Sequence, residues 1–249
     1  MPAYVLYIES GPKRRKTQVH VLQLLGCIAQ GATTDEALAN TPDAIRPFLR
    51  FNGKPVPASI TTTIAQHVTE GSWIGQGDPQ PGFPPDFEPL TAADLKTYVA
   101  RFRAIHARLL ELVAPLTPKQ LAAVPADGHR SIHQILDHVG GAQANYLRYQ
   151  VGAVEPLSAA LRDLRRASIW TQPRPQPNPA PDVPDIREAL RAIVDVTADR
   201  LSKLSAAERT KLVSHGEVTW SAHRCLRRCL EHGWEHLLEV SERLNIAAA

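Results

Sequence analysis

The chain has 249 residues, of which 43% are hydrophobic and 21% charged, so it can form one large or two small domains with apolar cores. The formal net charge of +3 is too small to indicate a nucleic-acid-binding protein by itself. No apolar run is long enough to cross a membrane, so no membrane partner is expected. The chain start lacks the features of a signal peptide, and three cysteines do not indicate a disulfide framework. We therefore expect a cytoplasmic protein.

The first 70 residues are expected to form a small α+β domain. Alternating and β-branched segments predict strands, and threonine followed by acidic residues predicts a helix start. The expected elements, in chain order, are strands at 3–9, 17–25 and 26–31, a helix from Thr33 or Thr34 to about Leu49, and a strand within 58–69. Pro42 and Pro47 should limit the regularity of this helix.

Residues 71–90 are rich in glycine and proline and predict a linker or an extended arm, which places a second domain at residues 91–249. Apolar residues at spacings of three and four then predict four long helices without intervening strands. These helices begin near Thr91, Ser131, Asp185 and Ser221, with a shorter helical stretch at Leu157–Trp170 and a polyproline segment at Pro173–Pro179. The fold class is therefore an α+β domain followed by an all-α four-helix bundle.

The last predicted helix carries two histidines, His232 and His236, on the same face. Side chains four residues apart on a helix have Cβ atoms about 5–6 Å apart, so two imidazoles can converge on one ion. His138 lies at the edge of the apolar stripe of the second long helix and is the best candidate for a third ligand. We therefore expect a metal site formed by His138, His232 and His236.

Three nitrogen ligands leave coordination positions for water or a substrate, which is typical of reactive metal sites. Imidazole suits zinc, nickel, iron or copper. The alternative is that these histidines only pack within the bundle. The other histidines considered are expected to be solvated or locally hydrogen-bonded: His106, His129, His133, His215 and His223. Cys225 and Cys229 are interpreted as core residues, because free cysteine is often a small buried side chain.

Two segments resemble the DinB-like (DinB/YfiT) metal-binding bundles over about residues 90–246. They are Ser131–Val139, with His138, and Leu226–Leu237, with His232 and His236. The resemblance implies that these three histidines bind a divalent metal, nickel or zinc. Relatives include enzymes that use low-molecular-weight thiols for isomerisation or S-transfer. It therefore implies a metal-dependent thiol S-transferase or isomerase, or a hydrolase, although no general base is evident among Glu231, Glu235 and Tyr146.

The segment Leu25–Asn40 resembles the glycine-cysteine turn and helix of HicB-like antitoxin domains, which implies a small α+β fold for residues 1–70. This resemblance implies an alternative function: the protein would be a non-catalytic binding or regulatory module whose HicB-like domain engages a protein or RNA. The basic run Lys13–Lys16 is the feature that favours RNA, but such a run is usually a solvated loop, so a nucleic-acid partner is not expected. The partners that remain are a small-molecule or thiol substrate and a second copy of the chain in a homodimer.

Overall fold

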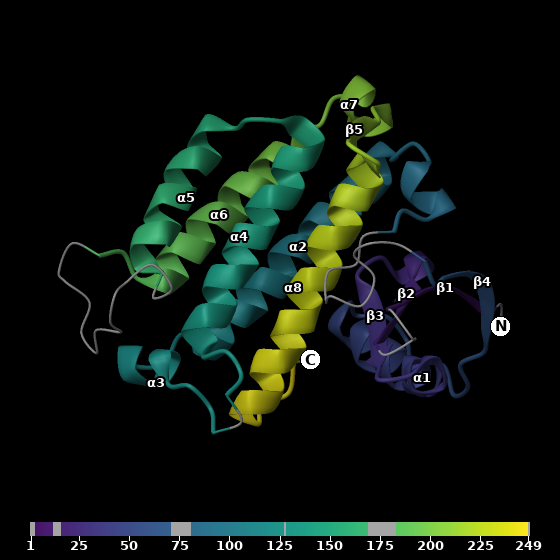
Figure 1. Ribbon diagram of the computed structural model, residues 1–249, viewed down its shortest axis with the longest axis horizontal. Coiled ribbons are helices and arrows are strands. Elements are labelled where there is room, and N and C mark those ends of the chain that lie inside the picture. The colour runs from purple at the N-terminus through teal and green to yellow at the C-terminus, as the bar shows by residue number, and fades with distance from the viewer. Residues whose placement is uncertain (1–2, 12–15, 71–80, 127, 169–182, 249) are drawn as a thin grey trace.

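A computed structural model describes residues 3–11, 16–70, 81–126, 128–168 and 183–248 (Figure 1). A strand-rich region within residues 4–68 precedes a helical region, so the predicted fold class is confirmed. The predicted polyproline segment, the tip of the basic run and the first half of the predicted linker lie outside the described residues. None of the helices in the described ranges is both long enough and apolar enough to traverse a membrane.

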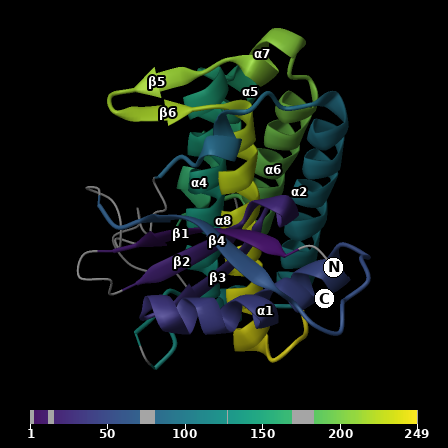
Figure 2. The ribbon, with the colours of Figure 1, turned by 90° about the vertical axis from the view of Figure 1, so that its right-hand side faces the viewer.

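The N-terminal unit is a four-stranded sheet covered by one helix (Figure 2). Its elements are β1 (Tyr4–Ser10), β2 (Thr17–Val21), the 3₁₀ turn Leu22–Leu24, β3 (Cys27–Gly31), α1 (Thr34–Phe51) and β4 (Thr62–Val68). The strand order is β3-β2-β1-β4, with antiparallel pairs except for β1 and β4, which are parallel. This unit has the small α+β fold expected of residues 1–70, while its HicB-like identity and the division at residues 70 and 90 remain predictions.

Helix α1 begins where the sequence predicts, because the Thr33 side chain accepts a hydrogen bond from the Glu36 amide. Pro42 and Pro47, which were expected to limit the regularity of this helix, both lie inside it, and the helix continues through them to Phe51. Its buried apolar face, which includes Phe48, packs on the sheet and offsets the hydrogen bonds that two prolines remove.

The helical region is built from four long helices whose starts agree with the sequence. They are α2 (Ala92–Val113), α4 (Ile132–Val151), α6 (Ile186–Ser202) and α8 (Ala222–Leu244). The shorter α5 (Glu155–Ala167) packs on α4 and α6. Side-chain oxygens of Thr91, Ser131, Asp185 and Ser221 accept a first-turn amide at the start of each long helix. These caps explain why the starts were predictable.

The 3₁₀ turn Leu22–Leu24 replaces the end of the strand expected at 17–25. Four other short elements were not expected from the sequence: the 3₁₀ turn Pro84–Phe87, α3 (Pro118–Ala122), α7 (Ala206–Thr210), and a hairpin of β5 (Val213–His215) and β6 (Val218–Trp220). The hairpin lies between α6 and α8, so the expectation of no intervening strands was wrong. Each strand has only three residues, too few for a detectable alternation of apolar side chains.

Helix α8 lies between the two parts of the molecule (Figure 1). It packs against α2 and α4 within the bundle and against β3 on its other side. The helix is therefore buried on two sides, and charged residues such as Arg227 and Glu231 are almost fully excluded from solvent. The placement of α8 creates the surroundings of the candidate site.

Candidate metal centre

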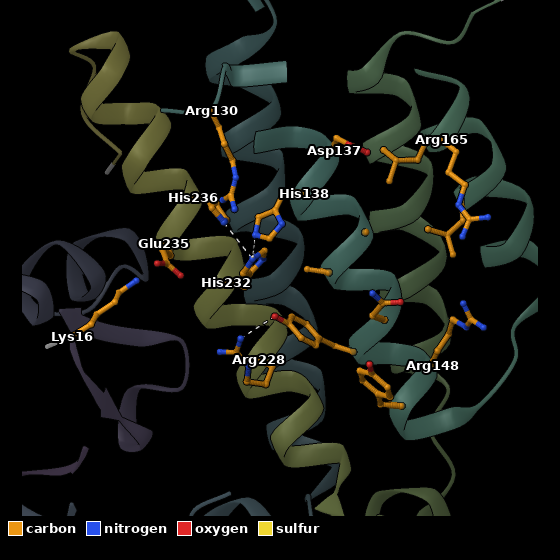
Figure 3. Close-up of a pocket in the computed structure, with 17 residues that line it drawn as sticks. Lys16, Arg130, Asp137, His138, Arg148, Arg165, Arg228, His232, Glu235 and His236 are labelled. Atoms are coloured by element: carbon orange, nitrogen blue, oxygen red, sulfur yellow. Dashed lines mark hydrogen bonds between the residues drawn. The ribbon is translucent and has the colours of Figure 1, made fainter. Parts of the chain in front are cut away.

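The three predicted histidines come together where α4 meets α8 (Figure 3). The Nε2 atoms of His138 and His232 are 3.0 Å apart, and those of His232 and His236 are 3.3 Å apart. His138 comes from α4, whose start is fixed by a reciprocal cap between Ser131 and Gln134. His232 and His236 lie one turn apart on α8, so backbone geometry alone aligns their rings.

This arrangement has the dimensions of a metal site. The ligand atoms of the three histidines all lie within 4.8 Å of one another, as ligands of one ion must. Nitrogen ligands about 2.0–2.1 Å from a tetrahedral metal would be about 3.3 Å apart, close to the two measured separations. The nitrogen donors of the three histidines and their separations therefore fit a divalent transition metal.

A carboxylate fixes the orientation of His236. The Nδ1 atom of His236 is 2.7 Å from Glu239 Oε2, and Arg243 holds the other carboxylate oxygen at 2.6 Å. Because a carboxylate accepts, Nδ1 carries the proton and Nε2 presents its lone pair to the cluster. Glu239 was not predicted from the sequence, although its position three residues after His236 on the helix was a usable signal.

The surroundings of His138 and His232 favour neutral imidazoles, the form that coordinates metals. Burial, His236 and Arg130 lower the pKa of His138 to about 4. Burial and the neighbouring His236 and His138 also lower the pKa of His232. The Nδ1 atom of His232 is buried without a hydrogen-bond partner among the described residues, so its Nε2 atom is the nitrogen directed to the cluster.

The histidines lie on the wall of a pocket with a volume of about 780 Å³. Helices α4, α5 and α8 supply most of its lining, and Lys16 of the N-terminal unit reaches its edge (Figure 3). Tyr146 lies beside His232, with ring centroids 5.9 Å apart, and its hydroxyl accepts a hydrogen bond of 2.8 Å from Arg228. A small molecule in this pocket could reach the histidine cluster, because His138 is only partly buried.

The two glutamates considered in the sequence take different positions. Glu231 is 1% exposed and therefore does not face solvent. Its carboxylate lies 2.7 Å from Nδ1 of His20 and also pairs with Arg227 and Arg228. Glu231 therefore orients the imidazole of His20 on β2, not an imidazole of the three-histidine cluster. Glu235 lines the pocket and accepts a hydrogen bond of 2.7 Å from Gln30 on β3.

A buried ionic network therefore joins the sheet to α8. Arg227 donates two hydrogen bonds to Asp86, at 2.8 and 2.9 Å, and so ties the second half of the predicted linker to the helix. Burial alone would raise the pKa of Glu231, but Arg227, His20 and Arg228 outweigh it and lower the pKa to about 2. Burial opposes ionisation of His20, yet Glu231 and Glu9 raise its pKa.

The remaining histidines and cysteines do not join the cluster. His106 is fully buried, and its Nδ1–H donates to the Phe102 carbonyl at 2.8 Å, in agreement with the predicted local hydrogen bond. Burial lowers the pKa of His106 to about 4. Cys225 and Cys229 are fully buried, which confirms their assignment to the core.

Comparisons with known proteins agree with this description of the helical region. The family model of the DinB superfamily matches residues 101–240, more than half of the chain, and this range includes all three histidines. No curated protein and no solved structure matches the chain. On the strength of the family match, the chain belongs to the DinB superfamily.

Proposed function

We propose that His138, His232 and His236 bind a divalent transition metal, nickel or zinc, and that the protein is a metal-dependent enzyme. Its substrate is a small molecule in the adjoining pocket, and its reaction is thiol transfer, isomerisation or hydrolysis. The observation that carries this proposal is the convergence of three imidazole nitrogens, with successive separations of 3.0 and 3.3 Å, on the wall of a pocket.

Three protein ligands favour a reactive site over a structural one. Structural zinc sites are closed by four protein ligands, whereas catalytic sites have three and leave a position for water or substrate. Among the described residues, only these three histidines form a cluster able to hold an ion. The pocket, with its volume of about 780 Å³, has the size of small-molecule binding sites.

The chain's own residues prepare this chemistry. A bound divalent metal would lower the pKa of a thiol or water ligand and so supply a nucleophile at neutral pH. Glu239 holds the proton of His236 on Nδ1 and aims Nε2 at the cluster. The Tyr146 hydroxyl, which Arg228 positions, lies on the pocket wall and can hydrogen-bond to a substrate. Burial of His232 and His236 keeps bulk water away from one side of the cluster.

The test is metal binding by purified protein, measured by elemental analysis before and after incubation with nickel or zinc. We expect one ion per wild-type chain and a loss of that ion in His138→Ala. The matched control is His129→Ala, which removes an exposed histidine shortly before α4 and should retain the metal. Wild-type protein that binds neither metal, or His138→Ala protein that binds with wild-type affinity, would overturn the proposal.

The enzymatic part needs a second measurement. A thermal-shift screen of metal-loaded protein should include low-molecular-weight thiols, because a ligand that binds only the folded protein must stabilise it. We expect thiols to raise the melting temperature of the metal-loaded wild-type protein but not of His138→Ala. Equal shifts in the two proteins would show that thiols do not bind at the metal and would contradict the thiol version of the proposal.

A further inference from the structure

The pocket beside the histidines carries an excess of positive charge. Five basic residues line it: Lys16, Arg130, Arg148, Arg165 and Arg228. Among the described residues, only two carboxylates line the same pocket, Asp137 and Glu235. Charged groups of one sign in a cleft reinforce one another and attract ligands of the opposite sign. Metal binding by three neutral histidines would add further positive charge to this pocket.

The two carboxylates are already engaged by neighbouring polar groups. Asp137 accepts a hydrogen bond of 2.7 Å from the Ser168 hydroxyl. Glu235 accepts a hydrogen bond of 2.7 Å from Gln30 on β3. This second bond joins α8 to the N-terminal sheet and holds Glu235 to that side of the pocket. These bonds orient the two carboxylates without removing their charge, and Arg228 is itself paired with Glu231. The other four basic residues of the lining still outnumber its two carboxylates.

The basic residues surround the histidines from different elements. Lys16 comes from the N-terminal unit, Arg130 precedes α4, Arg148 lies near the end of α4, and Arg228 lies on α8 (Figure 3). In Figure 3, Lys16 lies on one side of the histidines and Arg148 on the other. A ligand that reaches both must carry anionic groups at two separated positions.

The backbone holds Lys16 at this place. Its carbonyl accepts a hydrogen bond of 2.8 Å from the Gly11 amide, across the base of the β1–β2 hairpin. The next residue, Thr17, is hydrogen-bonded through its hydroxyl to Ser10 at 2.8 Å. The exposed Lys16 side chain thus extends from a fixed point on the sheet, and Figure 3 shows it directed toward Glu235.

We propose that this pocket binds a small organic molecule with at least two anionic groups, carboxylates or phosphates. Lys16, supplied by the N-terminal unit, and Arg148 of α4 bind those groups on opposite sides of the histidines. Arginine and lysine bind both kinds of anion, arginine through paired hydrogen bonds and lysine as a compact charge. The proposal names the substrate class for the proposed function, on which it rests for the reacting centre, and it gives the N-terminal unit a direct role in binding.

The test uses metal-free protein, so that its outcome is independent of metal binding. Glutarate is titrated against the full chain and followed by NMR, and glutaramide, the uncharged molecule of similar size, is titrated in parallel. Inorganic phosphate is titrated as the third ligand. We expect glutarate to bind more tightly than inorganic phosphate, which offers one anionic group only, and glutaramide not to bind, with the affinity of glutarate falling as salt is raised. Inorganic phosphate that binds as tightly as glutarate would show that one anionic group suffices and would overturn the proposal.

Variants then assign the binding to the two residues. Lys16→Ala and Arg148→Ala should each weaken anion binding by about two- to fivefold, the range for exposed charge pairs. Lys54→Ala is the matched control, since Lys54 is an exposed lysine of the same unit that does not line the pocket, and it should leave binding unchanged. Glutaramide binding as tightly as glutarate, or unchanged anion affinity in both pocket variants, would overturn the proposal. If the protein binds these anions as expected but does not bind nickel or zinc, the proposed function is wrong and the anion-binding proposal stands.

Discussion

Replacing Gly233 with alanine places a methyl group against a buried ring next to the candidate metal centre. A Cβ atom at this position would lie 2.8 Å from Cε1 and 3.2 Å from Nε2 of His106, and 3.2 Å from Cγ2 of Ile105. The His106 ring cannot move aside freely, because it is fully buried and bonded to the Phe102 carbonyl. Only glycine lets α8 approach α2 so closely at this point.

Two effects of opposite sign decide the result. Overpacking a well-packed core costs about 1–3 kcal/mol, whereas replacing glycine with alanine inside a helix gains about 1 kcal/mol. Gly233→Ala should therefore lower the free energy of unfolding by about 0–2 kcal/mol. Gly141→Ala is the matched control, because Gly141 lies within α4 and a methyl group added there would meet no atom of another described element within 4 Å. This control should gain about 1 kcal/mol.

Thermal unfolding of the two metal-free variants measures the difference. In a protein of this size, 1 kcal/mol shifts the melting temperature by about 2–4 °C, so Gly141→Ala should raise it by that amount. Gly233→Ala should lower it, or leave it unchanged at best. In a His106→Ala background, the same change at Gly233 should cost less, because the main clash is gone. An equal rise for Gly233→Ala and Gly141→Ala would refute this reasoning.

Three other substitutions test the polar contacts of α8. Glu239→Gln should weaken metal binding by about 10–100-fold, because His236 loses the carboxylate that orients it, and unchanged affinity in a metal titration would contradict this role. Asp86→Ala should cost about 3–5 kcal/mol in urea denaturation, because Arg227 stays buried after losing its bidentate partner, and a cost below about 1 kcal/mol would argue against it. His20 has a raised pKa in the folded protein, so its stabilising contribution is complete below about pH 6.5 and is lost as pH rises through the folded-state value. The urea midpoint of the wild type should therefore fall between pH 6 and 9, and that of His20→Gln should not fall for this reason. A pH profile of His20→Gln identical to that of the wild type would contradict this prediction.

The candidate site was partly predictable because some of its geometry is local. The four-residue spacing of His232 and His236 places both rings on one face of any helix, and capping residues such as Ser131 mark where the long helices start. His138 was a weaker inference from its position beside an apolar stripe. The structure brings its Nε2 atom to 3.0 Å from that of His232, although metal binding itself remains a proposal.

Other features of the site depend on contacts between segments that are far apart in the sequence. Glu231 has the sequence environment of an exposed helix residue, yet it is buried because the sheet covers that side of α8 and supplies His20. Lys16 and Arg148 are 132 positions apart in the sequence, and only packing of the N-terminal unit beside α8 brings both to one pocket. Such an arrangement leaves no periodic pattern in the sequence from which it could be predicted.

The sequence by itself determined the order of the four N-terminal strands and the four long helices, the starts of those helices, and the alignment of two histidines, because these follow from backbone geometry within a few residues. The tertiary structure decided which helix faces meet, that α8 is covered on two sides, and that five basic residues share the pocket with the histidines. These features depend on how whole elements pack to bury apolar surface, and that packing brings together residues whose separation in the chain carries no signal.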